Sequence, residues 1–276
     1  PMTEKQHRDL VHAWAKTLSV PEDVPKEGLD ALVQMITYFH DVFHISADDN
    51  EPLTSIRNVK FHAVLLPGAS PSFRMAIRCP PKDRERTAWH TRNAVDQGRW
   101  KLVPCCEWGA PAFTVDKPSV PEGRQVVDYR LTNKVLKRFR FSIPHMWDIL
   151  ARVSGAVFLS VLDAKSGFRQ VEYTDFAKKV FTVSTWEGLF QPQRLEMGPH
   201  NGPEAFQCLM HVIFGPLLWK SLLIFIDDLV CFTHSSIGPP RPVAALAVSE
   251  SFKVLVWNPN GLVRRHKSDP EGLSAF

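Results

Sequence analysis

Two adjacent aspartates interrupt one of the most apolar stretches of the chain. Residues 222–232 read LLIFIDDLVCF. Short runs of Leu, Ile, Val and Phe are typical of buried strands, and the two-residue interruption predicts a hairpin with Asp227 and Asp228 in its turn. Such a turn favours Asn-Gly or Asp-Gly, because it needs positive φ. Asp-Asp there places two like charges beside an apolar core, and either a bound cation or exposure of the turn to solvent would offset the repulsion.

A third carboxylate follows a second apolar run. Residues 157–162 read VFLSVL and are followed by Asp163. Two strands that each deliver an aspartate at one end can form a site for two metal ions about 3.5–4 Å apart, which activate a hydroxyl and stabilise a leaving oxygen. Carboxylate oxygens are ligands that Mg²⁺ prefers. The pattern therefore indicates a two-metal centre of the kind that polymerases use.

These two motifs resemble the reverse transcriptases of Ty3/gypsy-type LTR retrotransposons. The palm of that family pairs an aromatic-x-Asp-Asp hairpin with an upstream strand that ends in Leu-Asp-x-x-Ser-Gly-aromatic. The chain has Phe225-Ile226-Asp227-Asp228 and Leu162-Asp163-Ala164-Lys165-Ser166-Gly167-Phe168. The resemblance implies that Asp163, Asp227 and Asp228 are the catalytic and metal-binding residues, with two Mg²⁺ ions as cofactor and Mn²⁺ as an alternative.

The resemblance extends upstream to about residue 59. Residues 108–117, WGAPAFTVDK, are similar to the Trp-x-Ser/Ala-Pro-x-x-x-Val-x-Lys segment of the family's fingers. In the family, basic residues at the positions of Lys117 and Arg124 hold the incoming triphosphate, a task that suits a Lys point charge and an Arg fork of donors. From the residues alone, two surface cations are the alternative. Phe168 stands at the family's steric-gate position, which selects deoxynucleotides, and a buried aromatic ring beside Gly167 is the alternative there.

The most basic short run of the chain is a candidate nucleic-acid contact. Its cations are Lys134, Lys137, Arg138 and Arg140, with Phe139 and Phe141 among them. Cations can neutralise template phosphates and aromatic rings can stack on bases, but a solvated basic strand face fits the pattern equally well. The net charge of +4 is a mild excess that permits a polyanionic partner without requiring one.

Apolar periodicity predicts the elements around these motifs. Thr3 and Gln6 can form a capping box before a first helix. We expect further helices at 29–43, from 82 to about 97, and after Pro144 and Pro203, and strands at 179–183 and 188–190. Residues 61–69 resemble the family's entry strand and turn, which implies a strand at 61–66. The five cysteines include no C-x-x-C, and no apolar run approaches the roughly 20 residues that cross a bilayer. The sequence therefore predicts an intracellular protein, cytoplasmic or nuclear, without a membrane partner.

Two departures from the family stand out. Residues 197–203 read MGPHNGP where the family has Met-Pro-Phe-Gly-Leu-x-Asn-Ala-Pro, so a Pro-Phe pair that walls the nucleotide pocket is missing. The resemblance also stops at about Ser236, after which Gly and Pro residues forbid a continuing helix and a polar end predicts disorder. The family continues there into a helical thumb and usually a connection and RNase H domain.

The expected fold is α/β (α+β): the fingers and palm of a right-hand polymerase, with an antiparallel palm sheet backed by helices and the thumb missing. The expected segments are a helical N-terminal extension (1–56), a fingers and palm domain (57–236) and an unrelated, disordered tail (237–276). The resemblance implies an RNA-directed DNA polymerase that transfers a nucleotide from a dNTP to a primer 3′-hydroxyl on an RNA or DNA template. Other Pol domains, RNase H and integrase, are expected in a complete element. A catalytically inactive, nucleic-acid-binding remnant is the alternative.

Overall fold

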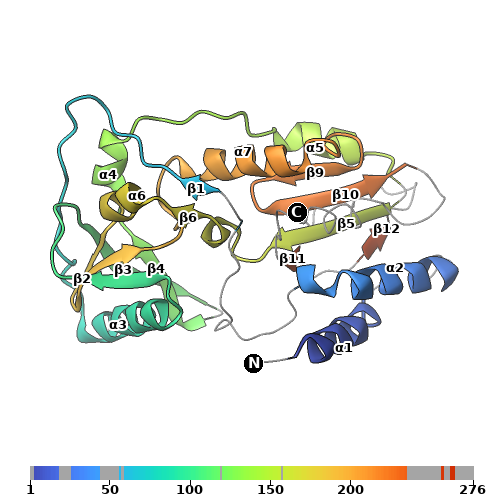
Figure 1. Cartoon of the computed structure of the whole chain (residues 1–276), viewed down its shortest axis with the longest axis horizontal. Coiled ribbons are helices and arrows are strands. Elements are labelled where there is room, and N and C mark those ends of the chain that lie inside the picture. The colour runs from blue at the N-terminus through green and yellow to red at the C-terminus, as the bar shows by residue number, and fades with distance from the viewer. Residues whose placement is uncertain are drawn as a thin grey trace. The chain divides into compact units, whose positions relative to one another are not determined.

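The computed structural model describes residues 3–18, 26–43, 56, 59–118, 120–156, 158–234, 256–257 and 262–264. The chain divides into two compact units. The first unit comprises Pro1–Ala47, Phe141–Gly167 and Phe206–Phe276, and the second comprises Asp48–Arg140 and Phe168–Ala205. Both combine sheets with helices (Figure 1), as the sequence predicted. The segment boundaries expected after residues 56 and 236 stay a prediction.

An antiparallel sheet is the centre of the first unit. Strand β5 (Phe158–Ala164) pairs with β10 (Asp228–Thr233), which pairs with β9 (Leu222–Phe225). Two short strands, β11 (Val256–Trp257) and β12 (Leu262–Arg264), also pair antiparallel with β5. These two segments lie within the tail that was expected to be disordered, and in the structure they pair with backbone groups of β5; the expectation for the tail stays a prediction. The rest of 237–276 lies outside the described residues.

One face of this sheet changes from apolar to acidic along its strands. Leu159 and Phe232 are buried in a core with Ile149 and Val153 of helix α5 (Met146–Val153) and with Leu223 of β9. Side chains alternate between the two faces of a strand. The same face therefore carries the residues four positions away from Leu159 and Phe232, which are Asp163 and Asp228. The pairing of β5 with β10 thus determines both the apolar contact with α5 and the position of the two aspartates.

The remaining helices of the first unit agree with the apolar periodicity. Helix α1 (Glu4–Ala15) begins at the capping box of Thr3 and Gln6, which is confirmed, and α2 (Lys26–Tyr38) is followed by a short 3-10 helix, η1 (His40–Val42). Helix α7 (Gly202–Phe214) runs alongside the β9–β10 hairpin (Figure 1). In the described part of the chain, no helix has the length and apolarity that crossing a membrane would need.

The second unit has its own sheet, in the order β2-β8-β7-β3-β4. Its strands are β2 (Trp100–Val103), β3 (Ala110–Lys117), β4 (Val120–Val127), β7 (Val183–Thr185) and β8 (Gly188–Pro192). A separate parallel pair joins β1 (Lys60–Phe61) to β6 (Glu172–Tyr173). The helical segments are α3 (Pro81–Asp96), α4 (Arg130–Val135), α6 (Asp175–Val180) and the 3-10 helix η2 (Gly167–Gln170).

Two strand predictions in the second unit are wrong in extent. The expected strand at 179–183 begins only at Val183, because Thr174 caps α6 by accepting the backbone N–H of Ala177, and the helix continues to Val180. The expected strand at 61–66 is limited to Lys60–Phe61, followed by a single bridge between Leu65 and Leu136. A local helix cap thus decides where the first strand begins, and long-range backbone pairing decides how far the second one extends.

Gly167 lies where an added methyl group has no room. A Cβ at this position would lie 2.8 Å from Cζ of Phe206 and 3.3 Å from Cβ of Ala164, and Phe206 is 1% exposed. We expect Gly167→Ala to lower the free energy of unfolding in urea by about 1–3 kcal/mol. Gly202→Ala is the matched control, because its nearest neighbour would be Leu195 Cδ1 at 3.8 Å. Equal losses in the two variants would contradict the steric argument.

Candidate active site

The hairpin between β9 and β10 places Asp227 in a two-residue turn. The turn residues are Ile226 and Asp227, because Asp228 is already paired with Phe225. The expected Asp227-Asp228 turn is therefore displaced by one residue. Ile226 adopts a left-handed φ of 57°, at the first turn position, where hairpins with this conformation normally have glycine. The polarity of the two aspartates suggested the wrong turn residues, since a β-branched residue is disfavoured at positive φ.

The sheet brings the three predicted aspartates together at one end. Asp163 and Asp228 are partners in the β5–β10 pairing, and residues directly opposite on antiparallel strands have Cβ atoms about 4.5–5.5 Å apart. The carbonyl oxygen of Asp227 accepts the backbone N–H of Ala164 at 3.0 Å, which holds Asp227 at the same end of the sheet as Asp163 and Asp228. Their catalytic role stays a prediction.

Negative charge accumulates at this end of the sheet. Burial raises the pKa of Asp163 to about 6, and repulsion from the carboxylates of Asp227 and Asp228 adds to the rise, while Lys165 opposes it. Burial and the charge of Asp227 also raise the pKa of Asp228. Folding therefore makes these two groups harder to ionise. A cation close to both would reverse the effect.

The donor set fits a metal that is shared with a substrate. Among the described residues, no three acidic, histidine or cysteine side chains form a complete metal site. Mg²⁺ is commonly held by one or two carboxylates and completes its octahedral shell with water and substrate phosphates. Neighbouring carboxylates with raised pKa values have the oxygen chemistry and the uncompensated charge for such an ion. The arrangement suits a catalytic divalent ion better than a structural one.

The predicted phosphate contacts lie on the β3–β4 hairpin of the second unit. Lys117 of β3 pairs with Val120 of β4. Arg124 of β4 pairs with Val115, which lies two residues before Lys117 on β3. Both cations have exposed side chains. A neighbouring cation, Arg86, is instead used within the structure, where it bonds Asp116 at 2.9 Å. The hairpin thus presents a Lys and an Arg on its surface, as a phosphate clamp requires.

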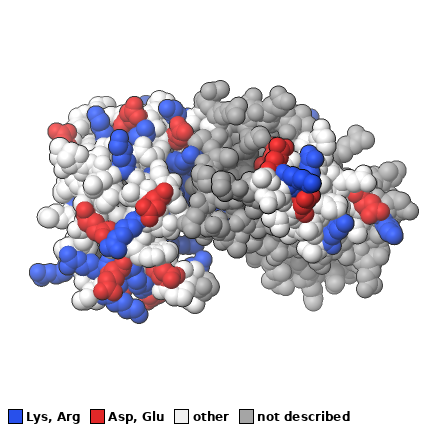
Figure 2. Space-filling model, turned by 60° about the horizontal axis from the view of Figure 1, so that its bottom comes forward, with Lys and Arg blue, Asp and Glu red and all other residues white. Residues whose placement is uncertain are grey.

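The basic run does not form a strand. Lys134 lies on α4, whereas Lys137, Arg138 and Arg140 follow it in a segment without strand pairing, and all four are exposed. The alternative of a basic strand face is therefore wrong, although the predicted exposure is present. On the face shown in Figure 2, Lys and Arg side chains are interspersed with Asp and Glu.

Two asparagines connect the basic run to the shortened segment 197–203. Asn201 donates from Nδ2 to the carbonyl of Lys137 at 2.9 Å and accepts the N–H of Phe139 at 3.1 Å. Asn133 donates to the carbonyl of Gly198 at 2.9 Å and accepts the N–H of His200 at 3.0 Å. Side-chain bonds to the backbone therefore close the segment where the Pro-Phe pair is missing.

Phe168 lies in η2, in the second unit, with a partly buried side chain. Its carbonyl accepts the N–H of Val171 at 3.0 Å. The following residue, Arg169, bonds the buried Glu196 at 3.3 Å, and Glu196 also accepts the indole N–H of Trp100 at 3.1 Å. These two contacts anchor the backbone that follows Phe168. The role of Phe168 as a steric gate stays a prediction.

Sequence reasoning missed Gln207 on α7. Its side chain is fully buried and contacts the hairpin: Oε1 accepts the N–H of Ile226 at 2.6 Å, and Nε2 donates to the carbonyl of Ile224 at 3.0 Å. The available signal was a single amide on the apolar stripe of a helix, between Phe206 and Met210. A buried amide needs hydrogen-bond partners, so its position indicated a polar contact inside the fold.

A family comparison supports this site. The family model described as "Reverse transcriptase (RNA-dependent DNA polymerase)" matches residues 115–248. That stretch includes the three aspartates, the β3–β4 cations and the basic run. Residues 115–248 of the chain thus resemble a reverse transcriptase domain. Enzymes of this family generally depend on divalent metal ions, which agrees with the charge at the end of the sheet.

Sequences similar to this chain occur in retrotransposons. The chain is 27% identical over 216 residues to the retrovirus-related Pol polyprotein from transposon 412 of Drosophila melanogaster, which covers 76% of this chain and 17% of the relative. It is 31% identical over 132 residues to that from transposon 297 of the same species, covering 46% and 12%. The resemblance to Ty3/gypsy-type elements is confirmed. The chain spans less than a fifth of the length of either relative.

Solved structures show the same fold. The protease-reverse transcriptase of prototype foamy virus matches 93% of this chain and 33% of its own, with a TM-score of 0.69 at 15% identity. The foamy viral protein in complex with an RNA/DNA hybrid matches 85% of this chain and 30% of its own, with a TM-score of 0.67 at 17% identity. The predicted polymerase fold is confirmed.

The pKa of Asp163 predicts how the stability of the metal-free protein depends on pH. Its value is about 6 in the folded protein, against an ordinary value of 3.8, so between these values the folded state binds more protons than the unfolded state. Stability should therefore fall as the pH rises through this window. We expect Asp163→Asn in EDTA to melt at a higher temperature than wild type at pH 7, and to converge with wild type near pH 4.

Asp128 provides a control of opposite sign. Hydrogen bonds from Arg130 lower its pKa to about 2, so its ionised form stabilises the fold above that pH and the contribution is lost as the pH falls. Asp128→Asn should therefore lower the melting temperature at pH 7. An Asp163→Asn variant that melts at or below wild type at pH 7 would argue against repulsion at the site.

Proposed function

We propose that this chain supplies the fingers and palm of an RNA-directed DNA polymerase, which transfers a nucleotide from a dNTP to a primer 3′-hydroxyl. The observation that carries the proposal is the meeting of Asp163, Asp227 and Asp228 at one end of an antiparallel sheet. They belong to strands far apart in sequence, and they lie within a matched reverse transcriptase domain. The carboxylates are partly buried and repel one another, and a bound catalytic cation would compensate this repulsion.

In this proposal, Asp163 and Asp227 bind two Mg²⁺ ions, for which Mn²⁺ can substitute, and Asp228 supports the site. When bound, the ions activate the primer hydroxyl and stabilise the charge on the departing pyrophosphate. The carboxylates fix the direction from which the hydroxyl and the α-phosphate approach, because β5 and β10 hold them in register. Lys117 and Arg124 bind the triphosphate oxygens.

The remaining assignments concern selection and grip. The ring of Phe168 excludes a ribose 2′-hydroxyl and so favours dNTPs. The basic run contacts template and primer phosphates without reading sequence, because phosphate contacts carry no base information. One solved structural neighbour is in complex with an RNA/DNA hybrid and another with double-stranded DNA. RNase H and integrase are proposed as further parts of the complete Pol polyprotein.

The alternative of an inactive remnant is not favoured. All three aspartates are retained, and burial alone gives no reason to keep adjacent carboxylates there, since their repulsion opposes folding. The segment with the missing Pro-Phe pair is closed by the bonds of Asn133 and Asn201. These features favour an active enzyme over a fold that only binds nucleic acid.

Primer extension on an RNA template, with Mg²⁺ and dNTPs, tests the proposed activity. Wild type should extend the primer, and Asp227→Asn should lose at least about 100-fold in rate, since the reacting groups are no longer held in place. Asp175→Asn is the matched control, because Asp175 is an exposed carboxylate that pairs with Lys178 at 2.8 Å.

Two outcomes of this experiment count against the proposal. Equal extension by wild type and Asp227→Asn would remove the aspartates from the mechanism. No extension by wild type, together with a Mg²⁺-dependent rise in melting temperature that Asp227→Asn lacks, would indicate a metal-binding remnant.

The basic run predicts a salt-dependent grip. Replacing Lys137, Arg138 and Arg140 with Ala should weaken binding to a primer-template duplex and reduce its salt dependence. Each phosphate contact contributes about 0.9 to the slope of log K against log salt, so the slope should fall by up to about 3. Fluorescence anisotropy over a salt series measures it. Lys5, Arg8 and Lys16, exposed on or next to α1, form the control triple, and an equal change there would contradict a local grip.

A further inference from the structure

The turn that presents Asp227 has a conformation that its sequence disfavours. Ile226 has a φ of 57°, and left-handed backbone is costly for a β-branched residue. Only glycine adopts it without steric cost. Such strain persists when surrounding structure determines the conformation, so a group outside the turn must hold Ile226.

Gln207 is the group that contacts the strained residue. Its Oε1 accepts the N–H of Ile226 at 2.6 Å, and its Nε2 donates to the carbonyl of Ile224 at 3.0 Å. One side-chain amide therefore supplies partners to two backbone groups at the end of β9. Gln207 is 0% exposed, so solvent does not compete for these bonds.

The contact reaches Asp227 through the backbone. Asp227 directly follows Ile226, and its own carbonyl accepts the N–H of Ala164 in β5 at 3.0 Å. The peptide before Ile226 is thus tied to α7, and the peptide after Asp227 is tied to β5. Movement of Ile226 would shift Asp227 relative to Asp163, which precedes Ala164 in β5.

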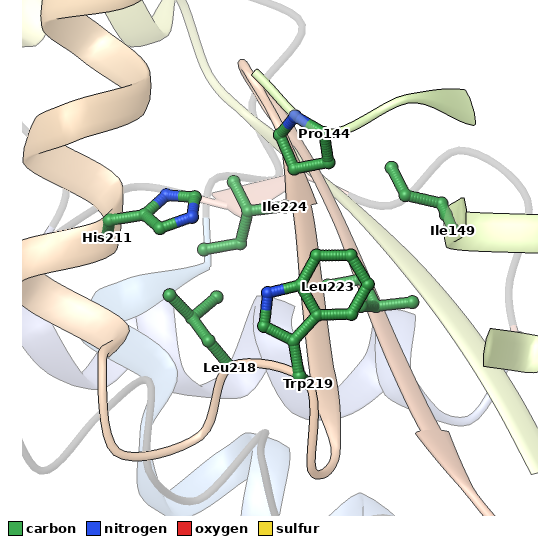
Figure 3. A pocket seen from close by; sticks show the side chains of 7 residues that line it. All are labelled: Pro144, Ile149, His211, Leu218, Trp219, Leu223 and Ile224. Atoms are coloured by element: carbon green, nitrogen blue, oxygen red, sulfur yellow. The ribbon is translucent and has the colours of Figure 1, made fainter. Parts of the chain in front are cut away.

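The surroundings of Gln207 fix its amide. His211, four residues later on α7, places Nδ1 3.1 Å from Gln207 Nε2. Figure 3 shows His211 extending from α7 toward Ile224, beside Leu218 and Trp219. The space among the side chains that line this pocket, which include His211 and Ile224, is too narrow for a water molecule.

We propose that Gln207 is a positioning residue, whose amide holds Ile226 in the left-handed conformation and thereby fixes Asp227 beside Asp163. The inference rests on the proposed function, because it assigns Gln207 a part in placing a metal-binding carboxylate. The competing explanation is that Gln207 contributes only to the packing of α7 on the sheet.

Gln207→Met in the full chain separates the two explanations, because Met keeps the length of the side chain and loses both hydrogen bonds. The readout is the Mg²⁺ concentration that gives half of the maximal rise in melting temperature. Losses of groups that orient a metal ligand typically cost about 10- to 100-fold in affinity, and we expect this midpoint to rise accordingly. Met210→Ala, a buried change on the same helix, should lower the melting temperature and leave the midpoint unchanged.

Rescue at the turn gives the sharpest test. Ile226→Gly removes the steric cost of positive φ, so the double variant Gln207→Met/Ile226→Gly should recover most of the Mg²⁺ affinity that Gln207→Met loses. An unchanged midpoint in Gln207→Met, or a double variant that binds as weakly as the single one, would overturn the proposal.

Amide exchange keeps this test independent of metal binding. If Mg²⁺ does not stabilise even the wild type, the proposed function fails, but the contact with Ile226 can still be measured in EDTA. Relative to the amides of β5, the Ile226 amide should exchange at least about 10-fold faster in Gln207→Met than in Met210→Ala. The reason is that Gln207→Met removes the 2.6 Å hydrogen bond from the Ile226 N–H to Gln207 Oε1. Equal relative rates would show that Gln207 does not hold the turn.

Discussion

The pairing of β5 with β10 is the interaction on which both the core and the site depend. It runs from Asp163 and Asp228 to Phe158 and Thr233 in one continuous antiparallel register. Because side chains alternate, this register turns Leu159 and Phe232 toward α5 and the two aspartates toward the same face beyond it. A slip by one residue would move both sets to the opposite face. Hydrophobic burial at one end of the strands therefore selects the geometry of the carboxylates at the other.

The same packing accounts for the electrostatics of the site. Burial that stabilises the sheet removes water from Asp163, and the turn adds the charge of Asp227, so the pKa of Asp163 rises to about 6. The apo fold thus carries a local conflict between burial and ionisation, together with backbone strain at Ile226. Such conflicts are typical of functional sites, where stability and activity oppose each other. In our proposals, both are compensated from outside the hairpin, the strain by Gln207 of α7 and the charge by a divalent ion that binds with the substrate.

The sequence was sufficient for features that depend on local pattern and was insufficient where tertiary contacts decide. The strands β5 and β10, the Thr3 capping box and the helix after Pro203 follow from local sequence pattern alone. The turn at Ile226 does not, because turn rules favour the polar Asp-Asp pair, whereas the structure shows Ile226 in contact with Gln207 of α7. The strand expected at residue 179 failed for a local reason, since the Thr174 cap begins a helix that continues over an apolar stretch. The meeting of the three aspartates could be predicted by resemblance, but the raised pKa values required coordinates.

The two asparagines that close the shortened segment have a consequence for how far the length of this loop can change. Asn133 and Asn201 each make a donor and an acceptor bond to backbone groups across the gap, so the four bonds depend on the present length of the loop. A change in the length of this loop would require Asn133 and Asn201 to find other backbone partners, because buried polar groups without partners destabilise a fold. The four bonds therefore make the backbone around residues 197–201 sensitive to the number of residues in the loop.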